Sequence, residues 1–182
     1  MITDDTPDRR GPLSDPTAAA LSELAERDAV SRTWAGDHTL WRRDPTEIAD
    51  RLGWLSVVPD MNARLEDTAA RCAALADGAE HVLLAGMGGS SLFPEVVARS
   101  TPPGADGPTL HVLDTTDPAA IARLGGELAP ERTLHIAASK SGTTLETRSH
   151  LAWAWDRHPD PAGFAVITDP GSELAALATE RG

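Results

Sequence analysis

The chain has 182 residues, of which 41% are hydrophobic, and this is enough for one sizeable core but not for a second domain of similar size. Its 16 basic and 28 acidic residues give a formal net charge of −12, and no basic run occurs that could follow a nucleic-acid backbone, so nucleic acid is not an expected partner. The longest strongly apolar stretch, residues 81–87, is far shorter than a membrane-spanning helix, so no membrane partner is expected either.

Two further features predict a soluble protein of the cytoplasm. Residues 1–20 are polar and rich in proline, and they contain no signal-peptide core. Cys72 is the only cysteine, which excludes a disulfide within the chain and fits a reducing compartment. We expect its side chain to be buried inside a helix.

The N-terminal part of the chain is predicted to be mostly helical. Residues 1–16 are charged and proline-rich, with too little apolar surface to offset the entropy of ordering them, which predicts a flexible arm. Apolar residues then recur at helical spacing through residues 17–78, with helices expected from Thr17, over 45–55 and over 61–75.

From residue 79 onward, short apolar runs alternate with helical patterns. Strands are predicted over 81–85, 109–113, 133–138 and 164–168, and they are followed by helices over 91–99, 118–128, 143–157 and 172–179. Strands that alternate with helices need crossover connections, so the pattern predicts a parallel sheet covered on both faces. We therefore expect residues 79–182 to form a doubly wound α/β domain, in which ligands bind outside the carboxyl ends of the strands.

The first of these strands ends in a glycine-rich turn, Gly86-Met87-Gly88-Gly89-Ser90-Ser91. Three glycines in four positions remove Cβ atoms where a ligand could approach the backbone, and two hydroxyls follow at the helix start. A tight turn without a ligand is the alternative. A dinucleotide site is not favoured, because the spacing is not G-x-G-x-x-G and Asp114 only loosely meets the expected acidic position.

The third strand ends in a second polar turn, Ser139-Lys140-Ser141-Gly142-Thr143-Thr144. Four hydroxyls, one glycine and the only lysine of the chain occur within six residues, at a helix start where unpaired N–H groups point outward. A phosphate monoester needs several convergent donors of this kind, so we expect the turn to bind one. An ordinary Ser/Thr-rich turn is the alternative.

The remaining polar residues have simpler interpretations. Thr143 and Glu146 fit a capping box, while a role for Glu146 facing a bound sugar stays open. His150 is expected to be solvated on a helix face. Three other histidines stand near strand starts and are interpreted as polar strand ends, because no carboxylate or cysteine joins them at the spacing of metal ligands: His81, His111 and His135.

The two turns, with about fifty residues between them, resemble the paired signatures of the sugar isomerase domain in the phosphoglucose isomerase family. The residues that carry the resemblance are 86–92 and 139–147. The match runs from about Trp34 to the end of the chain, and it is closest to the isomerase half of bacterial transaldolase–phosphoglucose isomerase fusions, which share the segments 34–41 and 168–172. Gly142 departs from the pattern, since some members carry an aromatic or other residue there.

The resemblance implies a three-layer αβα sandwich with flavodoxin-like strand order, preceded by a helical segment. It also implies no cofactor and no metal, and it assigns roles to residues of both turns. The residues expected to bind phosphate are Ser139, Lys140, Ser141, Thr143 and Thr144, those beside the sugar are Gly88, Gly89 and Ser90, and Glu146 would stand behind them.

The family interconverts glucose 6-phosphate and fructose 6-phosphate in glycolysis and gluconeogenesis, through a cis-enediol and with a glutamate as base. In the family the catalytic residues lie beyond the point where this sequence stops, so we expect no catalytic residue here. The expected function is therefore hexose 6-phosphate binding without efficient isomerisation, and a non-catalytic phosphosugar sensor on the same fold is the alternative. The strand over 164–168 would keep an open edge, so a homodimer or pairing with a second sugar isomerase domain is expected.

Overall fold

The structure is a computed structural model that describes residues 14–101 and 107–182 of the chain. The described residues fall into two compact units, one up to Glu66 and one from Asp67 to Gly182. The flexible arm predicted over residues 1–16 lies outside the described residues, except for its last positions, 14–16, which open the first helix.

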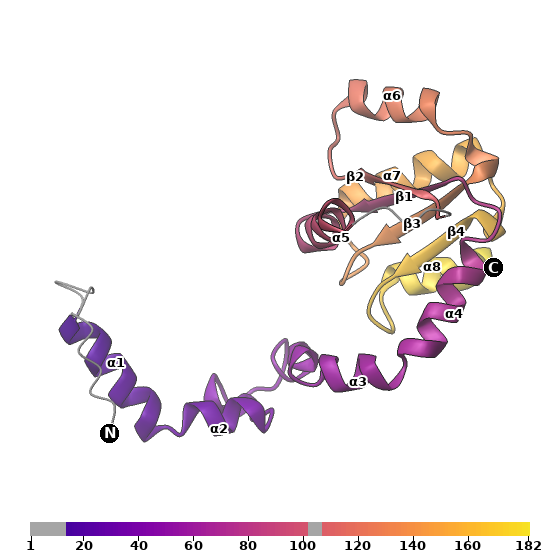
Figure 1. Ribbon diagram of the computed structural model, residues 1–182. Coiled ribbons are helices and arrows are strands. Elements are labelled where there is room, and N and C mark those ends of the chain that lie inside the picture. The colour runs from indigo at the N-terminus through magenta and orange to yellow at the C-terminus, as the bar shows by residue number, and fades with distance from the viewer. Residues whose placement is uncertain (1–13, 102–106) are drawn as a thin grey trace. The chain divides into compact units, whose positions relative to one another are not determined.

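The first unit consists of short helices and turns (Figure 1). Its helices are α1 (Ser14–Glu26), α2 (Ala29–Trp34) and α3 (Val57–Ala63), and 3-10 turns occupy His38–Leu40, Ala49–Arg51 and Gly53–Leu55. The helix predicted over 45–55 is therefore wrong. Glu47 adopts a left-handed φ of 56°, which interrupts a helix and leaves only isolated turns after it.

The helix predicted over 61–75 is divided in two. Arg64, at φ −113° and ψ 6°, leaves the helical region between α3 and α4 (Leu65–Leu75). No residue of α4 is buried and Cys72 is exposed, so the prediction of a buried cysteine is wrong. The alanines around Cys72 favour a helix, but this propensity does not create a face that packs.

Four parallel strands form the sheet of the second unit, in the order β2-β1-β3-β4 (Figure 1). The strands are β1 (His81–Gly86), β2 (Thr109–Leu113), β3 (Thr133–Ala138) and β4 (Phe164–Ile167). They are followed in turn by α5 (Gly89–Ser100), α6 (Pro118–Glu127), α7 (Leu145–Arg157) and α8 (Glu173–Arg181). Every predicted strand is present, with ends that agree to within one residue.

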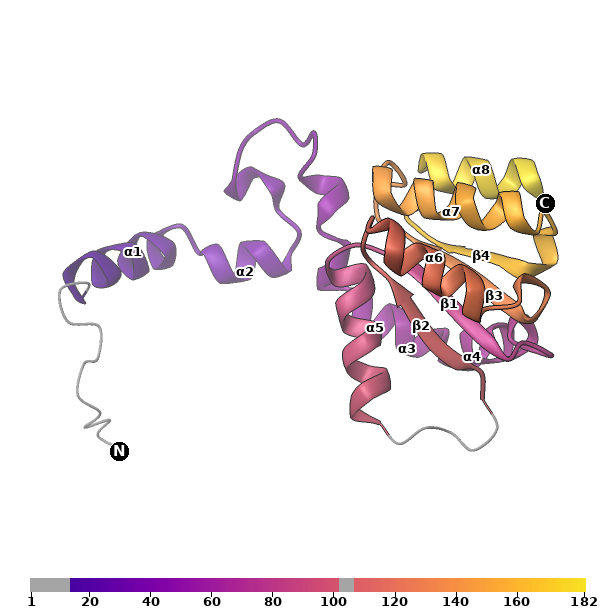
Figure 2. The same ribbon diagram turned by 90° about the horizontal axis from the view of Figure 1, so that it is seen from above.

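Helices cover both faces of this sheet (Figure 2): α6, α7 and α8 lie on one face, and α5 lies on the other. The strand order matches the first strands of the flavodoxin-like order 2-1-3-4-5. The expected fold class, a doubly wound three-layer αβα sandwich with helices before it, is confirmed. In the part of the chain that the structure describes, no helix is both long and apolar enough to cross a membrane.

The core lies between the sheet and the helices α6 to α8. One cluster joins β1 and β2 to α6 through Leu83, Leu113, Leu124 and Leu128, with Trp153 of α7 against it. A second cluster joins β3, α7 and α8 through Ala137, Leu151 and Leu174. Each such leucine stabilises the fold by about 1.5–3 kcal/mol relative to an exposed position. The strands that lead into the two predicted turns are therefore held by a packed core.

Candidate functional site

The two predicted turns lie side by side at the carboxyl edge of the sheet. They leave the neighbouring strands β1 and β3, whose last residues, Gly86 and Ala138, are paired in register. The approach is close, because a Cβ on Gly86 would lie 3.3 Å from the Ala138 carbonyl and 3.1 Å from the Cβ of Ser90. The sequence predicts this meeting from topology, and the structure confirms it.

The glycine-rich turn is compact and leaves two glycines at the surface. Gly88 adopts φ 57° and ψ −127°, a conformation suited to glycine, and α5 begins directly after it. The hydroxyl of Ser91 donates to the Gly88 carbonyl at 3.0 Å and is fully buried, so it holds the turn together. Gly88 and Gly89 are exposed and Ser90 is half-buried, as a ligand beside them would require.

The polar turn contains two hydroxyl pairs. The buried Ser139 Oγ lies 2.9 Å from Thr144 Oγ1 and accepts the Gly142 amide at 3.2 Å. At the surface, Ser141 Oγ lies 2.9 Å from Thr143 Oγ1 and accepts the Thr143 amide at 3.2 Å. The hydroxyls thus bridge the turn internally, and each can rotate toward a stronger acceptor.

Several main-chain donors of the same turn have no protein partner. Among the described residues, no hydrogen bond is made by the amides of Lys140, Ser141 and Thr144 or by those of the first residues of α7, 145–147. The positive end of the α7 helix dipole lies at the same place. The turn therefore offers a group of neutral donors that suits an anion.

The capping box expected at this helix is not formed. Thr144, not Thr143, is the N-cap of α7, and its side chain makes no capping bond. Thr143 is engaged with Ser141, which is why its hydroxyl does not reach forward. Glu146 is half-buried in the first turn of α7.

Gly142 is the position at which the polar turn touches α8. Its φ is 73°, and a Cβ there would lie only 2.6 Å from the Leu174 main-chain nitrogen. The start of α8 is fixed in turn by Ser172, whose hydroxyl accepts the Ala175 amide at 3.1 Å. Only glycine fits between these elements, so the packing of α8 sets the position of the turn.

The charge of the only lysine is engaged by the loop after β4. Lys140 Nζ lies 2.6 Å from Asp169 Oδ2, and the Asp169 amide donates to the Lys140 carbonyl at 3.3 Å. The sequence motif contains Asp169 but gives no sign of this pairing. The residues are 29 positions apart, and only the adjacency of β3 and β4 brings them together.

His150 is another residue whose position is not predicted correctly from the sequence. The expected position is the solvated surface of α7, but the side chain is only 3% exposed, so that prediction is wrong. Its Nε2 lies 3.0 Å from the Thr115 carbonyl, which can only accept, so Nε2 carries the proton. Burial lowers the pKa of His150, which favours the neutral ring, and the bond ties α7 to the loop after β2.

The histidines near the strand starts lie at the other end of the sheet. His81 Nδ1 and His111 Nε2 are 3.2 Å apart, and the His135 ring stacks on Phe164 with centroids 4.8 Å apart. Within residues 14–101 and 107–182, no group of three or more His, Cys, Asp or Glu side chains could hold a metal ion.

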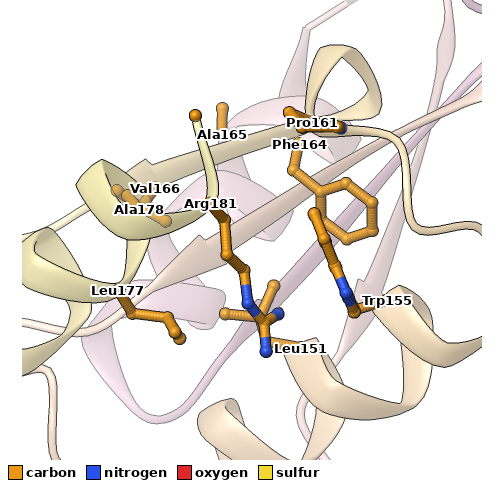
Figure 3. A pocket seen from close by; sticks show the side chains of 10 residues that line it. Leu151, Trp155, Pro161, Phe164, Ala165, Val166, Leu177, Ala178 and Arg181 are labelled. Atoms are coloured by element: carbon orange, nitrogen blue, oxygen red, sulfur yellow. The ribbon is translucent and has the colours of Figure 1, made fainter.

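A separate apolar cavity of 220 Å³ lies beside β4, between α7 and α8 (Figure 3). Arg181 reaches from α8 toward α7, where its guanidinium lies 4.4 Å from the centroid of the Trp155 ring. None of the predicted site residues lines this cavity, so it is distinct from the edge with the two turns.

Comparison with known proteins supports one family. The family model described as phosphoglucose isomerase matches residues 60–157. Similar curated proteins include the glucose-6-phosphate isomerases of Thermosynechococcus vestitus, 39% identical over 109 residues, and of Chelativorans sp. strain BNC1, 30% identical over 191 residues. These alignments cover 56% and 92% of this chain but 20% and 34% of those proteins, so the chain spans a fifth to a third of their length.

Two solved structures are similar in fold. The crystal structure of a hypothetical protein from Thermus thermophilus has a TM-score of 0.68 and 29% identity, and the match covers 96% of this chain and 40% of that chain. A glucose-6-phosphate isomerase from Chlamydia trachomatis has a TM-score of 0.52 and 23% identity, with 78% of this chain and 28% of that chain covered. The second comparison bears on the fold alone.

Proposed function

The chain belongs to the phosphoglucose isomerase family, and from this premise we propose that its polar turn binds the phosphate of a hexose 6-phosphate. The proposed donors are the hydroxyls of the turn and its free main-chain amides, together with those at the start of α7. The hydroxyls assigned to this role are those of Ser139, Ser141, Thr143 and Thr144, and the amides are those of Lys140, Ser141 and Thr144.

The observation that carries the proposal is the set of unpartnered donors in one short segment. Among the described residues, the amides of Lys140, Ser141 and Thr144 make no bond to protein, and the hydroxyls of Ser139 and Thr144 meet at 2.9 Å. A phosphate dianion accepts several such bonds at once, and each hydrogen bond to a charged group contributes about 1.5–3 kcal/mol. The net charge of −12 does not oppose this, because neutral donors hold the anion.

The sugar is proposed to lie over the glycine-rich turn. Gly88, Gly89 and Ser90 stand next to the polar turn, because Gly86 and Ala138 are neighbours in the sheet. The two exposed glycines would allow a ring to approach the main chain, and we propose that Glu146, in the first turn of α7, lies behind the phosphate. In this proposal residues 79–182 are the sugar-phosphate-binding domain, and residues 17–78 are a helical segment that precedes it.

The reaction proposed for the whole protein is the interconversion of glucose 6-phosphate and fructose 6-phosphate. The curated relatives carry the name of that enzyme, and these 182 residues span a fifth to a third of their length. We propose that the 182 residues alone bind the sugar phosphate and isomerise it poorly. Binding supplies orientation, whereas a positioned acid–base group is typically worth about 10²–10⁴-fold in rate. A phosphorylated substrate also agrees with the cytoplasmic location expected from the sequence.

Calorimetric titration of the 182-residue chain with glucose 6-phosphate and with glucose tests the binding. Heat of binding is expected for glucose 6-phosphate and not for glucose at equal concentration, and equal binding of both would contradict a phosphate site.

A coupled assay of fructose 6-phosphate formation tests the proposal that the 182 residues isomerise the sugar phosphate poorly. Turnover close to that of a complete isomerase would overturn it. Binding without turnover in a longer polypeptide that contains these residues would instead favour a phosphosugar sensor.

We also propose that the free edge of β4 takes part in assembly. In the described chain β4 pairs only with β3, Ile167 is 61% exposed, and the apolar cavity opens beside the strand. An unpaired edge of this kind is a template for another strand. For the 182 residues alone, we propose a homodimer through β4; in a longer polypeptide, a second sugar isomerase domain would compete for this edge.

A further inference from the structure

Lys140, the only lysine of the chain, brings an ammonium group to the polar turn, yet a carboxylate holds it. Nζ lies 2.6 Å from Asp169 Oδ2, and the side chains are 59% and 52% exposed. The Asp169 amide donates to the Lys140 carbonyl at 3.3 Å, so the same two residues are joined twice. The pair carries no net charge, so the donors that the turn offers to an anion are its neutral amides and hydroxyls.

The Lys140 carbonyl and the Lys140 ammonium both face Asp169. The peptide between Lys140 and Ser141 is trans, like every peptide that the structure describes, so its carbonyl and the Ser141 N–H point in opposite directions. The carbonyl faces the loop after β4, where it accepts the Asp169 amide. The Ser141 N–H therefore points away from the Asp169 amide.

We propose that Asp169 limits the affinity of the polar turn for phosphate by holding the ammonium of Lys140. This inference rests on the proposed function of the turn. An oppositely charged pair adds little field at the anion, whereas a lone ammonium on the turn would attract a dianion through partly exposed space. Tight binding of a phosphate group that does not react lowers KM without raising kcat, and a lower affinity leaves the product free to depart.

Loss of the ion pair should leave the turn in place. Exposed ion pairs of this kind contribute little to stability. The turn keeps other attachments, which include the Ser139 amide donating to the Ile167 carbonyl at 3.0 Å, the Thr168 hydroxyl donating to the Lys140 carbonyl at 3.4 Å, and the contact of Gly142 with Leu174. Asparagine at position 169 retains the main-chain amide that donates to Lys140, so Asp169→Asn removes the charge and keeps the backbone bond.

A double-mutant cycle measured by calorimetry with glucose 6-phosphate tests the inference. Asp169→Asn is expected to lower Kd about three- to tenfold at low ionic strength, with a gain that shrinks at high salt because screening weakens exposed charges. In a Lys140→Met background, the same substitution is expected to change Kd less than about twofold, because no ammonium remains to be released. The matched control is Asp156→Asn, which removes an exposed charge near the end of α7 and should leave Kd unchanged.

Two results would overturn the inference. Unchanged or weaker binding by Asp169→Asn would mean that the pair does not restrain Lys140. An equal gain in the Lys140→Met background would mean that any lost negative charge tightens binding, with no part for the pair. Absence of glucose 6-phosphate binding by the unsubstituted chain would instead count against the proposed function, so the two failures are distinguishable.

Discussion

The buried hydroxyl of Ser139 is the group around which the polar turn is organised. It contacts Thr144 Oγ1 at 2.9 Å and accepts the Gly142 amide at 3.2 Å, so it both shapes the turn and is proposed to donate to phosphate. Ser139→Ala removes a bond to a charged group, which contributes about 1.5–3 kcal/mol, and we expect Kd for glucose 6-phosphate to rise roughly 10- to 100-fold. Calorimetry measures this directly.

The matched control is Ser149→Ala. Its exposed hydroxyl donates to the Leu145 carbonyl and to no group proposed to hold the phosphate, so its loss should leave Kd nearly unchanged. Equal losses in both variants would show that Ser139 acts only through helix stability.

Gly142 is the second residue whose substitution has a specific expected effect. At φ 73°, with only 2.6 Å between a Cβ and the Leu174 nitrogen, alanine would strain the backbone and displace the start of α8. We expect Gly142→Ala to lower the free energy of unfolding by about 1–3 kcal/mol or more in urea denaturation. Gly126→Ala in α6 has open space and no positive φ, and it should be neutral or stabilising. A Gly142→Ala protein as stable as the unsubstituted one would contradict the packing described.

Among the elements, α7 is tied to the loop after β2 by a neutral histidine. Burial lowers the pKa of His150, and the opposing effects of the bond to the Thr115 carbonyl and of the Glu146 and Asp114 carboxylates do not outweigh it. Since the ordinary pKa is 6.5, the stability that the neutral ring contributes is complete above pH 6.5 and is lost as the pH falls through the lowered folded-state value. The same sign holds for His111 and His135, whose pKa values burial also lowers.

We therefore expect the free energy of unfolding to fall between about pH 7.5 and 5.5, and to fall less in His150→Gln. Glutamine can still donate to the Thr115 carbonyl but does not titrate. Urea denaturation at both pH values measures the difference. An identical pH dependence in the two proteins would show that His150 is not linked to unfolding.

The elements also show where a single sequence is informative. Strands over 109–113 and 133–138 are predicted with their observed ends, because continuous apolar runs between turn residues mark buried parallel strands. The helices predicted over 45–55 and 61–75 fail at Glu47 and Arg64, whose backbone conformations no spacing rule reveals. Propensity is a weak prior wherever local packing does not support it.

For the candidate site, too, the sequence predicts some features and misses others. Topology alone brings the two turns to one edge, because parallel strands end on the same side of a sheet. The pairing of Lys140 with Asp169 and the burial of His150 depend on which strands are neighbours, and strand order is a tertiary property. Thr143 shows a local limit, since its hydroxyl has a nearer partner in Ser141 than the helix end that it is expected to cap.

For the whole molecule, the free edge of β4 predicts association. Light scattering of the 182-residue chain is expected to show a mass that rises from monomer toward dimer with concentration. Ile167→Lys places a charge on the edge and should shift the mass to monomer. Leu92→Lys, at a similarly exposed apolar position on α5, is the control and should leave association unchanged. A monomer at every concentration would exclude a dimer through β4.

Neutral main-chain donors of the polar turn are proposed to hold the phosphate of a sugar. Amide chemical shifts of the isotopically labelled chain, recorded during titration with glucose 6-phosphate and with glucose, report on these donors one by one. We expect glucose 6-phosphate to move the amide signals of Lys140, Ser141 and Thr144 and of the first residues of α7, and glucose to leave them in place. Shifts confined to other parts of the chain, or equal shifts with both sugars, would contradict it.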